Sequence, residues 1–92
     1  MRSELDEDFI KLFAKLPERV QKAARKNYQL WQQDPNHPSL EFKKVNTKQP
    51  VYSIRVGMGW RAVGIKKDSQ TIVWFWIGSH SEYDNLLKEL YT

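Results

Sequence analysis

The hydrophobic residues of the chain recur with a helical period near both ends and with a strand period in between. Over the first third, apolar side chains lie three and four positions apart, which predicts one helix over residues 6–16 and a second over residues 17–33. Pro17 separates them, because proline fits the first turn of a helix but interrupts a preceding one. A turn-forming segment with two prolines, residues 34–39, ends the second helix. We therefore expect an N-terminal helix hairpin.

From residue 40 onward, apolar and polar positions alternate with the period of two that is typical of strands. The pattern predicts four strands, over residues 40–45, 51–56, 60–66 and 71–77. The last of them is apolar on both faces, which favours a position inside the sheet. Ser79, followed three positions later by Glu82, forms a capping box and predicts a closing helix. The order of elements predicts an α+β fold: a helix hairpin packed on a small, mainly antiparallel, four-stranded sheet, with a short C-terminal helix.

A glycine motif near the middle of the chain has the spacing of a dinucleotide-binding loop. It reads Gly-Met-Gly-Trp-Arg-Ala over residues 57–62. Dinucleotide-binding loops open a helix at this point, whereas here the strand pattern continues on both sides. We interpret the two glycines as a hairpin turn, where they supply positive φ angles that other residues avoid.

Composition narrows the class of protein. The 92 residues suffice for one domain, which we place over residues 1–92. The chain has no cysteine and only two histidines, so a disulfide scaffold and a thiolate metal site are excluded and we expect no metal or other cofactor. Its longest apolar run is the six residues 72–77, and its N-terminal residues 1–9 are acidic, so we expect neither a membrane span nor a signal peptide. These features indicate a soluble, cytoplasmic protein.

The distribution of charge along the chain is uneven. The net charge is +4, but residues 11–67 alone carry +10, while residues 1–10 and 68–92 carry −3 each. A basic body of this kind attracts polyanions such as nucleic acids. A solvated basic helix face, with terminal charges that suit helix dipoles, explains the same pattern.

Basic side chains gather on the predicted strands, where each is held on a defined face. Arg55 and Arg61 lie on either side of the hairpin turn, so we expect them close together on adjacent strands. An arginine pair suits a phosphate group, which a guanidinium grips with two donors. Surface charge, or ion pairs with Glu41 or Asp68, is the alternative. Two further bases lie on the preceding strand: Lys43 and Lys44.

Polar and aromatic residues around the last strand are further candidates for a site. His80 follows that strand directly and has a side chain that exchanges protons near neutral pH, although a capping role is an alternative. Tyr83 shares a helical face with leucines, so we expect core packing, with a hydroxyl that reaches the site. Three tryptophans are able to stack on bases, but core packing explains at least two of them: Trp60, Trp74 and Trp76.

Four segments follow one another along the chain in an order that is typical of one protein family. They read FIKLFAKLP, HPSLEFKKV, VYSIRVGMGWRAVGI and IVWFWIGSHSEYDNLL. Together they resemble the RelE/ParE superfamily of type II toxin–antitoxin toxins, from about residue 9 to residue 87. The segment GSHSEYD is similar to the end of the YafQ-type members. Many members open with a β-strand before the first helix, and residues 1–5 offer at most a stub of one.

The resemblance implies an activity and a role for several residues. RelE-branch members are small ribonucleases that cleave mRNA, generally on the ribosome. Arg61 matches the arginine that stabilises the scissile phosphate, and Arg55 falls where members place a strand lysine or arginine. His80 matches the general acid of the YafQ type, and Tyr83 lies near the C-terminal tyrosine of other members. Lys43 falls near the position at the end of the first sheet strand where some members carry a basic residue or a histidine. No residue matches a general base of the family.

We therefore expect a metal-independent endoribonuclease, an mRNA interferase that leaves 2′,3′-cyclic phosphate and 5′-OH ends and inhibits translation. Arg55, Arg61, His80 and Tyr83 would be catalytic, with Arg61 contacting phosphate and not the core. Lys43 or Lys44 would hold the RNA backbone or accept a proton. The expected partners are mRNA, the ribosome and a cognate antitoxin. The alternatives are a ParE-like inhibitor of DNA gyrase, without nuclease activity, and a non-toxic nucleic-acid-binding relative.

Overall fold

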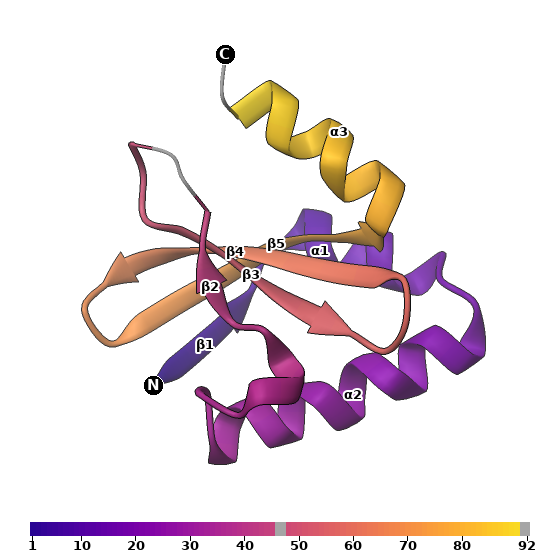
Figure 1. Ribbon diagram of the computed structural model, residues 1–92, viewed down its shortest axis with the longest axis horizontal. Coiled ribbons are helices and arrows are strands. Elements are labelled where there is room, and N and C mark those ends of the chain that lie inside the picture. The colour runs from indigo at the N-terminus through magenta and orange to yellow at the C-terminus, as the bar shows by residue number, and fades with distance from the viewer. Residues whose placement is uncertain (46–47, 91–92) are drawn as a thin grey trace.

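The computed structural model of the protein, described for residues 1–45 and 48–90, is a mixed five-stranded sheet with helices on both faces (Figure 1). The strands are β1 (Arg2–Leu5), β2 (Lys43–Lys44), β3 (Val51–Val56), β4 (Trp60–Asp68) and β5 (Thr71–Ser79). The helices are α1 (Glu7–Ala14), α2 (Glu18–Gln33), the 3-10 turn η1 (Pro38–Leu40) and α3 (His80–Leu90). The strand order is β1-β5-β4-β3-β2, in which β1 runs parallel to β5 and the other pairs are antiparallel.

The predicted α+β class is confirmed, with two N-terminal helices and a C-terminal one, but the sheet has five strands and not four. The missed strand is β1, at the outer edge of the sheet. Of its four residues only Ser3 is partly buried, so the segment shows no alternation of apolar and polar positions. Backbone pairing with β5 defines the strand instead, and the N–H groups of Arg2 and Asp6 extend this pairing to Gln70 and Trp74.

The first predicted strand, over residues 40–45, is wrong in its extent, because β2 contains only Lys43 and Lys44. Two features upstream interrupt the extended backbone. Residues Pro38–Leu40 form the 3-10 turn η1. Glu41 then adopts a left-handed backbone conformation with φ of 47°, and it is the only described residue other than glycine with a positive φ. The chain therefore reaches the sheet three residues later than the apolar pattern suggests.

The face of the sheet that carries α1 and α2 holds the larger core. Trp31 of α2 is fully buried there, with its ring edge-on to Phe42 at 5.8 Å and to Trp74 at 5.5 Å between ring centroids. Pro17 precedes α2 and separates it from α1, as predicted. The side-chain amide of Gln21 donates to the carbonyl groups of Phe13, at 3.0 Å, and of Leu16. These bonds tie the end of α1 to the start of α2.

The opposite face of the sheet carries α3 and a smaller core (Figure 1). Its buried members are Val45, Val51, Val63 and Tyr83. The β3–β4 hairpin turns through Gly57 and Gly59, whose φ angles of 54° and 82° confirm the predicted role of the glycine motif. Of the described part of the chain, no helix has both the length and the apolar character that crossing a membrane requires.

Candidate functional site

The two strand arginines lie directly opposite each other on the face that carries α3. The register of the β3–β4 hairpin pairs Arg55 with Arg61. Residues that face each other across an antiparallel pair project from the same side of the sheet. Ser53 precedes Arg55 by two positions and shares this side. The predicted proximity of the two arginines is therefore confirmed by the register.

Arg61 is buried, with only 5% of its side chain exposed. One terminal nitrogen, Nη2, donates to the hydroxyl of Ser53 and to the backbone carbonyl of Glu41, both at 3.2 Å. The other, Nη1, lies 3.5 Å from Oε1 of Glu41, and the guanidinium carbon lies 5.2 Å above the ring of Tyr83. Arg61 thus belongs to the packed interior as well as to the site, which differs from the expectation that it avoids the core.

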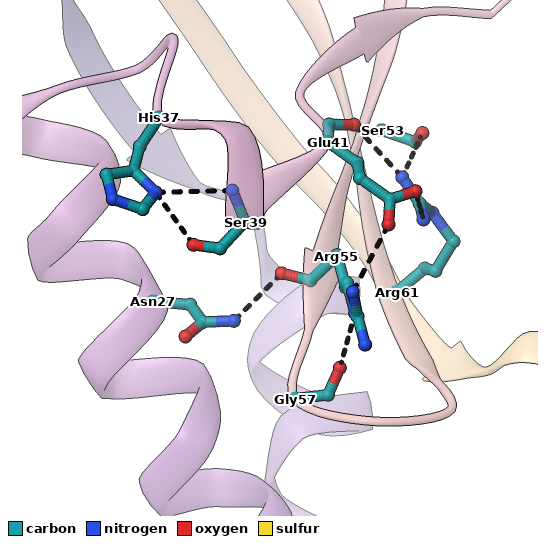
Figure 2. A network of polar contacts seen from close by, with 8 residues as sticks. All are labelled: Asn27, His37, Ser39, Glu41, Ser53, Arg55, Gly57 and Arg61. Carbon is teal, nitrogen blue, oxygen red and sulfur yellow. Dashed lines mark hydrogen bonds and ion pairs between the residues drawn. The ribbon is translucent and has the colours of Figure 1, made fainter.

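Arg55 lies at the solvent side of the same pair, with 42% of its side chain exposed. Its Nη1 lies 3.4 Å from Oε2 of Glu41, and its Nε donates to the carbonyl of Gly57 at 3.1 Å. The side-chain amide of Asn27, on α2, donates to the Arg55 carbonyl at 3.0 Å. Figure 2 shows the Glu41 carboxylate between the two guanidinium groups. The ion-pair alternative raised by the sequence therefore holds for Glu41.

The other acid considered as a partner, Asp68, is the last residue of β4, next to the turn that leads to β5. Its carboxylate accepts the backbone N–H of Gln70 at 2.8 Å. This hydrogen bond is the main reason why the pKa of Asp68 lies below its ordinary value. Asp68 is therefore part of the turn structure and not of the arginine site.

The two lysines of β2 project from different sides of the sheet. Lys43 pairs with Ser53 and shares its face, whereas Lys44 pairs with Tyr52 and faces the side that carries α1 and α2. Both side chains are exposed. The sheet thus places Lys43 on the face of the two arginines and separates Lys44 from them.

His80 and Tyr83 bring α3 to the arginines. His80 is the first residue of α3, and its backbone N–H donates to the carbonyl of Gly59 at 2.8 Å, which fixes the helix start beside the hairpin turn. Its ring lies 5.8 Å from that of Tyr83, and its Nε2 lies 3.8 Å from Oδ1 of Asp84. The Tyr83 ring also contacts the Arg61 guanidinium, so one ring contacts both Arg61 and His80. The predicted residues Arg55, Arg61, Tyr83 and His80 therefore gather in one region.

The hydroxyl of Tyr83 is already engaged. It donates to Ser53 Oγ at 3.1 Å, and the same oxygen accepts a hydrogen bond from Arg61. Ser53 therefore links the tyrosine to the arginine in a buried chain of hydrogen bonds. This arrangement gives Tyr83 a positioning role toward Arg61, whereas His80 and Arg55 keep exposed side chains that a ligand can reach.

A reciprocal capping box starts α3, as the sequence predicts. The N–H of Ser79 donates to Oε1 of Glu82 at 3.0 Å, and the N–H of Glu82 donates back to Ser79 Oγ at 3.3 Å. The Ser79 N–H, followed by the Ser79 hydroxyl, lowers the pKa of the Glu82 carboxyl. A depressed carboxyl pKa stabilises the folded state above the ordinary glutamate value, and this stabilisation is lost as the pH falls through the folded-state pKa.

Ser79→Ala should lower the free energy of unfolding by about 0.5–1 kcal/mol at pH 7, since one orphan N–H at the helix start loses its acceptor. The difference from the wild type should shrink as the pH falls through the lowered pKa of Glu82, because the protonated carboxyl accepts more weakly. Urea unfolding at pH 7 and pH 3 measures both effects. Ser69→Ala, in the exposed β4–β5 turn, is the matched control. Equal stability of Ser79→Ala and the control at pH 7 would show that the box does not stabilise α3.

The three tryptophans considered for base stacking are used in packing. Trp74 is buried in the larger core, and Trp60 packs against its margin. Trp76 packs on the other face, 6.4 Å from the Tyr83 ring. The expectation that core packing accounts for at least two of them is confirmed.

Two members of the site were not predicted as such: Ser53 and the Glu41 backbone carbonyl. Ser53 gave one signal, since it is a small polar residue that shares a strand face with Arg55. The Glu41 carbonyl gave none. Among residues 1–45 and 48–90, no three His, Cys, Asp or Glu side chains lie close enough together to hold a metal ion. The arrangement of two guanidinium groups beside an imidazole suits an anion.

Comparison with known proteins supports this fold. The family model described as a ParE-like toxin domain matches residues 18–85. A chain of the RelB–RelE antitoxin–toxin complex from Methanococcus jannaschii is similar to this one. The match covers 90% of this chain and 96% of that chain, with a TM-score of 0.71 and 18% identity. The isolated RelE toxin of E. coli is similar over 96% of both chains, with a TM-score of 0.65 and 19% identity. No curated protein sequence matches this chain.

Proposed function

This chain belongs to the ParE-like toxin domain family, and from that premise we propose that it acts as a metal-independent endoribonuclease that cleaves mRNA and inhibits translation. The match confirms the superfamily that the sequence motifs indicate, and it makes the chain a toxin of the toxin–antitoxin kind. The observation that carries the nuclease proposal is the pairing of Arg55 with Arg61 on one sheet face, next to His80 at the start of α3.

The proposed reaction uses the RNA itself as nucleophile. The ribose 2′-oxygen attacks the adjacent phosphorus and forms a 2′,3′-cyclic phosphate, while the bond from phosphorus to the 5′-oxygen breaks. The 2′-hydroxyl proton passes to water acting as base. Charge gathers on the non-bridging phosphoryl oxygens, where Arg55 and Arg61 supply donors and positive charge. His80 gives a proton to the departing 5′-oxygen, which leaves as a 5′-OH.

The remaining groups hold the arginines and the RNA in place. Ser53 accepts a hydrogen bond from the Arg61 guanidinium, and the Tyr83 hydroxyl donates to Ser53, so both residues fix the orientation of Arg61. Lys43 lies on the same sheet face and is exposed, so it contacts the RNA backbone on the side of β2. The +10 charge of residues 11–67 favours docking on ribosomal RNA.

A cognate antitoxin is the proposed protein partner. The similar RelE proteins of Methanococcus jannaschii and E. coli are solved in complex with RelB antitoxins. The basic body of this chain attracts an acidic partner. We propose that the antitoxin covers the arginine face with an amphipathic helix, which keeps mRNA out.

Inhibition of DNA gyrase is the second candidate, since the family model that matches is of the ParE-like kind. It differs from the first because it requires protein binding and no reaction at phosphorus. Induced expression in growing bacteria, with parallel labelling of new protein and new DNA, separates the two. We expect protein synthesis to fall first, with mRNA fragments that begin with a 5′-OH. Arrest of DNA synthesis with intact mRNA would favour gyrase.

Arg55→Ala should reduce mRNA cleavage by at least about tenfold. The expected loss is smaller than for an enclosed donor, because the Arg55 guanidinium is exposed. The fold should be retained, since the Arg55 side chain is half exposed and its partner on α2 is bound through the backbone. Arg19→Ala on α2 removes the same charge from an exposed position away from this face. Equal loss in the two variants would mean that total charge, and not the site, controls cleavage.

A further inference from the structure

We infer that the Glu41 carboxylate is a resident anion that occupies the phosphate position between Arg55 and Arg61, so that a phosphate group binds only by displacing it. Identifying that phosphate as part of mRNA rests on the proposed function. The competition between the Glu41 carboxylate and a phosphate for the arginine pair does not depend on that function.

The carboxylate spans both guanidinium groups. Oε1 lies 3.5 Å from Nη1 of Arg61, and Oε2 lies 3.4 Å from Nη1 of Arg55. One oxygen therefore serves each arginine, as two non-bridging oxygens of a phosphate would (Figure 2). An entering phosphate and the Glu41 carboxylate cannot use the same pair of donors at once.

Two like charges facing each other across a β-ladder need a counter-charge. Arg55 and Arg61 are direct cross-strand partners, and such pairs of equal charge destabilise a sheet. The buried Arg61 has the greater need, since a charge removed from water is costly unless it is paired. Glu41 supplies the only carboxylate that forms an ion pair with either arginine among the described residues. Glu41 thus offsets one of the two positive charges from within the protein.

The same contacts leave the carboxylate free to move. Both of its distances to nitrogen exceed the 2.7–2.9 Å that is typical of short charge-assisted hydrogen bonds. The side chain is 45% exposed, and it follows the short turn η1 outside the regular strands. A carboxylate held in this way can rotate into solvent without unpacking either core.

Arg61 keeps its orientation when the carboxylate leaves. The backbone carbonyl of Glu41 and the hydroxyl of Ser53 both accept from Nη2, and neither bond depends on the Glu41 side chain. The Nε of Arg61 has no hydrogen-bond partner among the described residues, so the guanidinium is not saturated by its present contacts. Displacement of Glu41 therefore exposes a preformed pair of anion-binding groups.

Glu41→Gln tests this inference, because it removes the charge and keeps the shape. Inorganic phosphate is titrated into the folded protein, and its dissociation constant is read from the NMR shifts of the β3–β4 hairpin. We expect phosphate to bind at least about fivefold more tightly to Glu41→Gln, since one charge pair at about 4 Å in water contributes that much. Glu4→Gln is the matched control. It removes the same charge from an exposed ion pair with Lys67 at the other edge of the sheet, and should change the affinity less than about twofold.

Equal or weaker phosphate binding by folded Glu41→Gln would overturn the inference, since Glu41 would then not compete for the site. If Glu41→Gln does not fold, Glu41→Asn replaces it, because asparagine tolerates the left-handed backbone of this position. The same tightening is expected of it, and its absence has the same meaning. Phosphate binding is independent of cleavage. A protein that shows the tightening but leaves mRNA intact would refute the nuclease proposal alone.

Discussion

Arg61→Ala should slow the single-turnover cleavage of mRNA by at least about 10²-fold, which is the usual cost of losing one donor that stabilises transition-state charge. Arg61 is the enclosed member of the arginine pair, and its guanidinium is held by Ser53 and by the Glu41 carbonyl. A group held in this way needs no reorganisation when charge develops on the phosphate. Its removal should therefore affect the rate more than removal of the exposed Arg55.

The same substitution should also lower the free energy of unfolding by about 1–3 kcal/mol, because it empties a buried site and leaves Glu41 without one of its two partners. Val20→Ala provides a control for stability, since Val20 is buried in the core on the opposite face and takes no part in the site. That variant should lose comparable stability and cleave at the wild-type rate below its unfolding temperature. Wild-type cleavage by folded Arg61→Ala would remove Arg61 from the mechanism.

The fold was predictable wherever burial and secondary structure produce the same period. Strand β3 has the predicted bounds of residues 51–56, since its alternate residues Tyr52, Ile54 and Val56 all pack in the larger core. Strand β1 left no such trace, because its pairing with β5 runs through the backbone. The length of β2 was overestimated, because Leu40 belongs to the predicted strand but is buried as part of the turn η1.

The site was predictable only as far as the hairpin determines it. A tight turn at residues 57–59 places Arg55 opposite Arg61, so their proximity followed from turn length and strand period. The burial of Arg61 did not, because it depends on α3 returning over the sheet and placing Tyr83 against the guanidinium. The interaction with Glu41 likewise depends on a left-handed backbone conformation at that residue. Contacts between distant segments, and single unusual φ angles, leave no periodic signal in a sequence.

Tyr83 shows how core packing and function can coincide in one residue. The sequence suggested a core tyrosine whose hydroxyl reaches the site, and the buried ring and its bond to Ser53 agree with that interpretation. The same ring contacts the Arg61 guanidinium and the His80 ring, so one core residue borders both the proposed charge-stabilising group and the proposed proton donor.

His80→Gln should slow the chemical step by at least about 10²-fold, since positioned proton transfer contributes about 10²–10⁴ to a rate. RNA affinity should change little, because Arg55, Arg61 and Lys43 supply the charge that binds phosphate. Stability should also change little, since the His80 side chain is mostly exposed and its bond to Gly59 is made by the backbone N–H. A general acid must carry its proton, so the wild-type rate should fall as the pH rises, and the variant should lack this fall.

The second histidine of the chain provides a matched control for this experiment. His37 lies in the loop before η1, where its Nδ1 contacts the N–H and hydroxyl of Ser39. His37→Gln makes the same chemical change outside the cluster of Arg61, Tyr83 and His80, so its cleavage rate and pH profile should match those of the wild type. Single-turnover cleavage of ribosome-bound mRNA across a range of pH, together with thermal unfolding, measures both variants. An unaltered rate constant in folded His80→Gln would remove the proton donor from the mechanism. Gyrase inhibition would then become the better-supported function, because it needs no acid at this position.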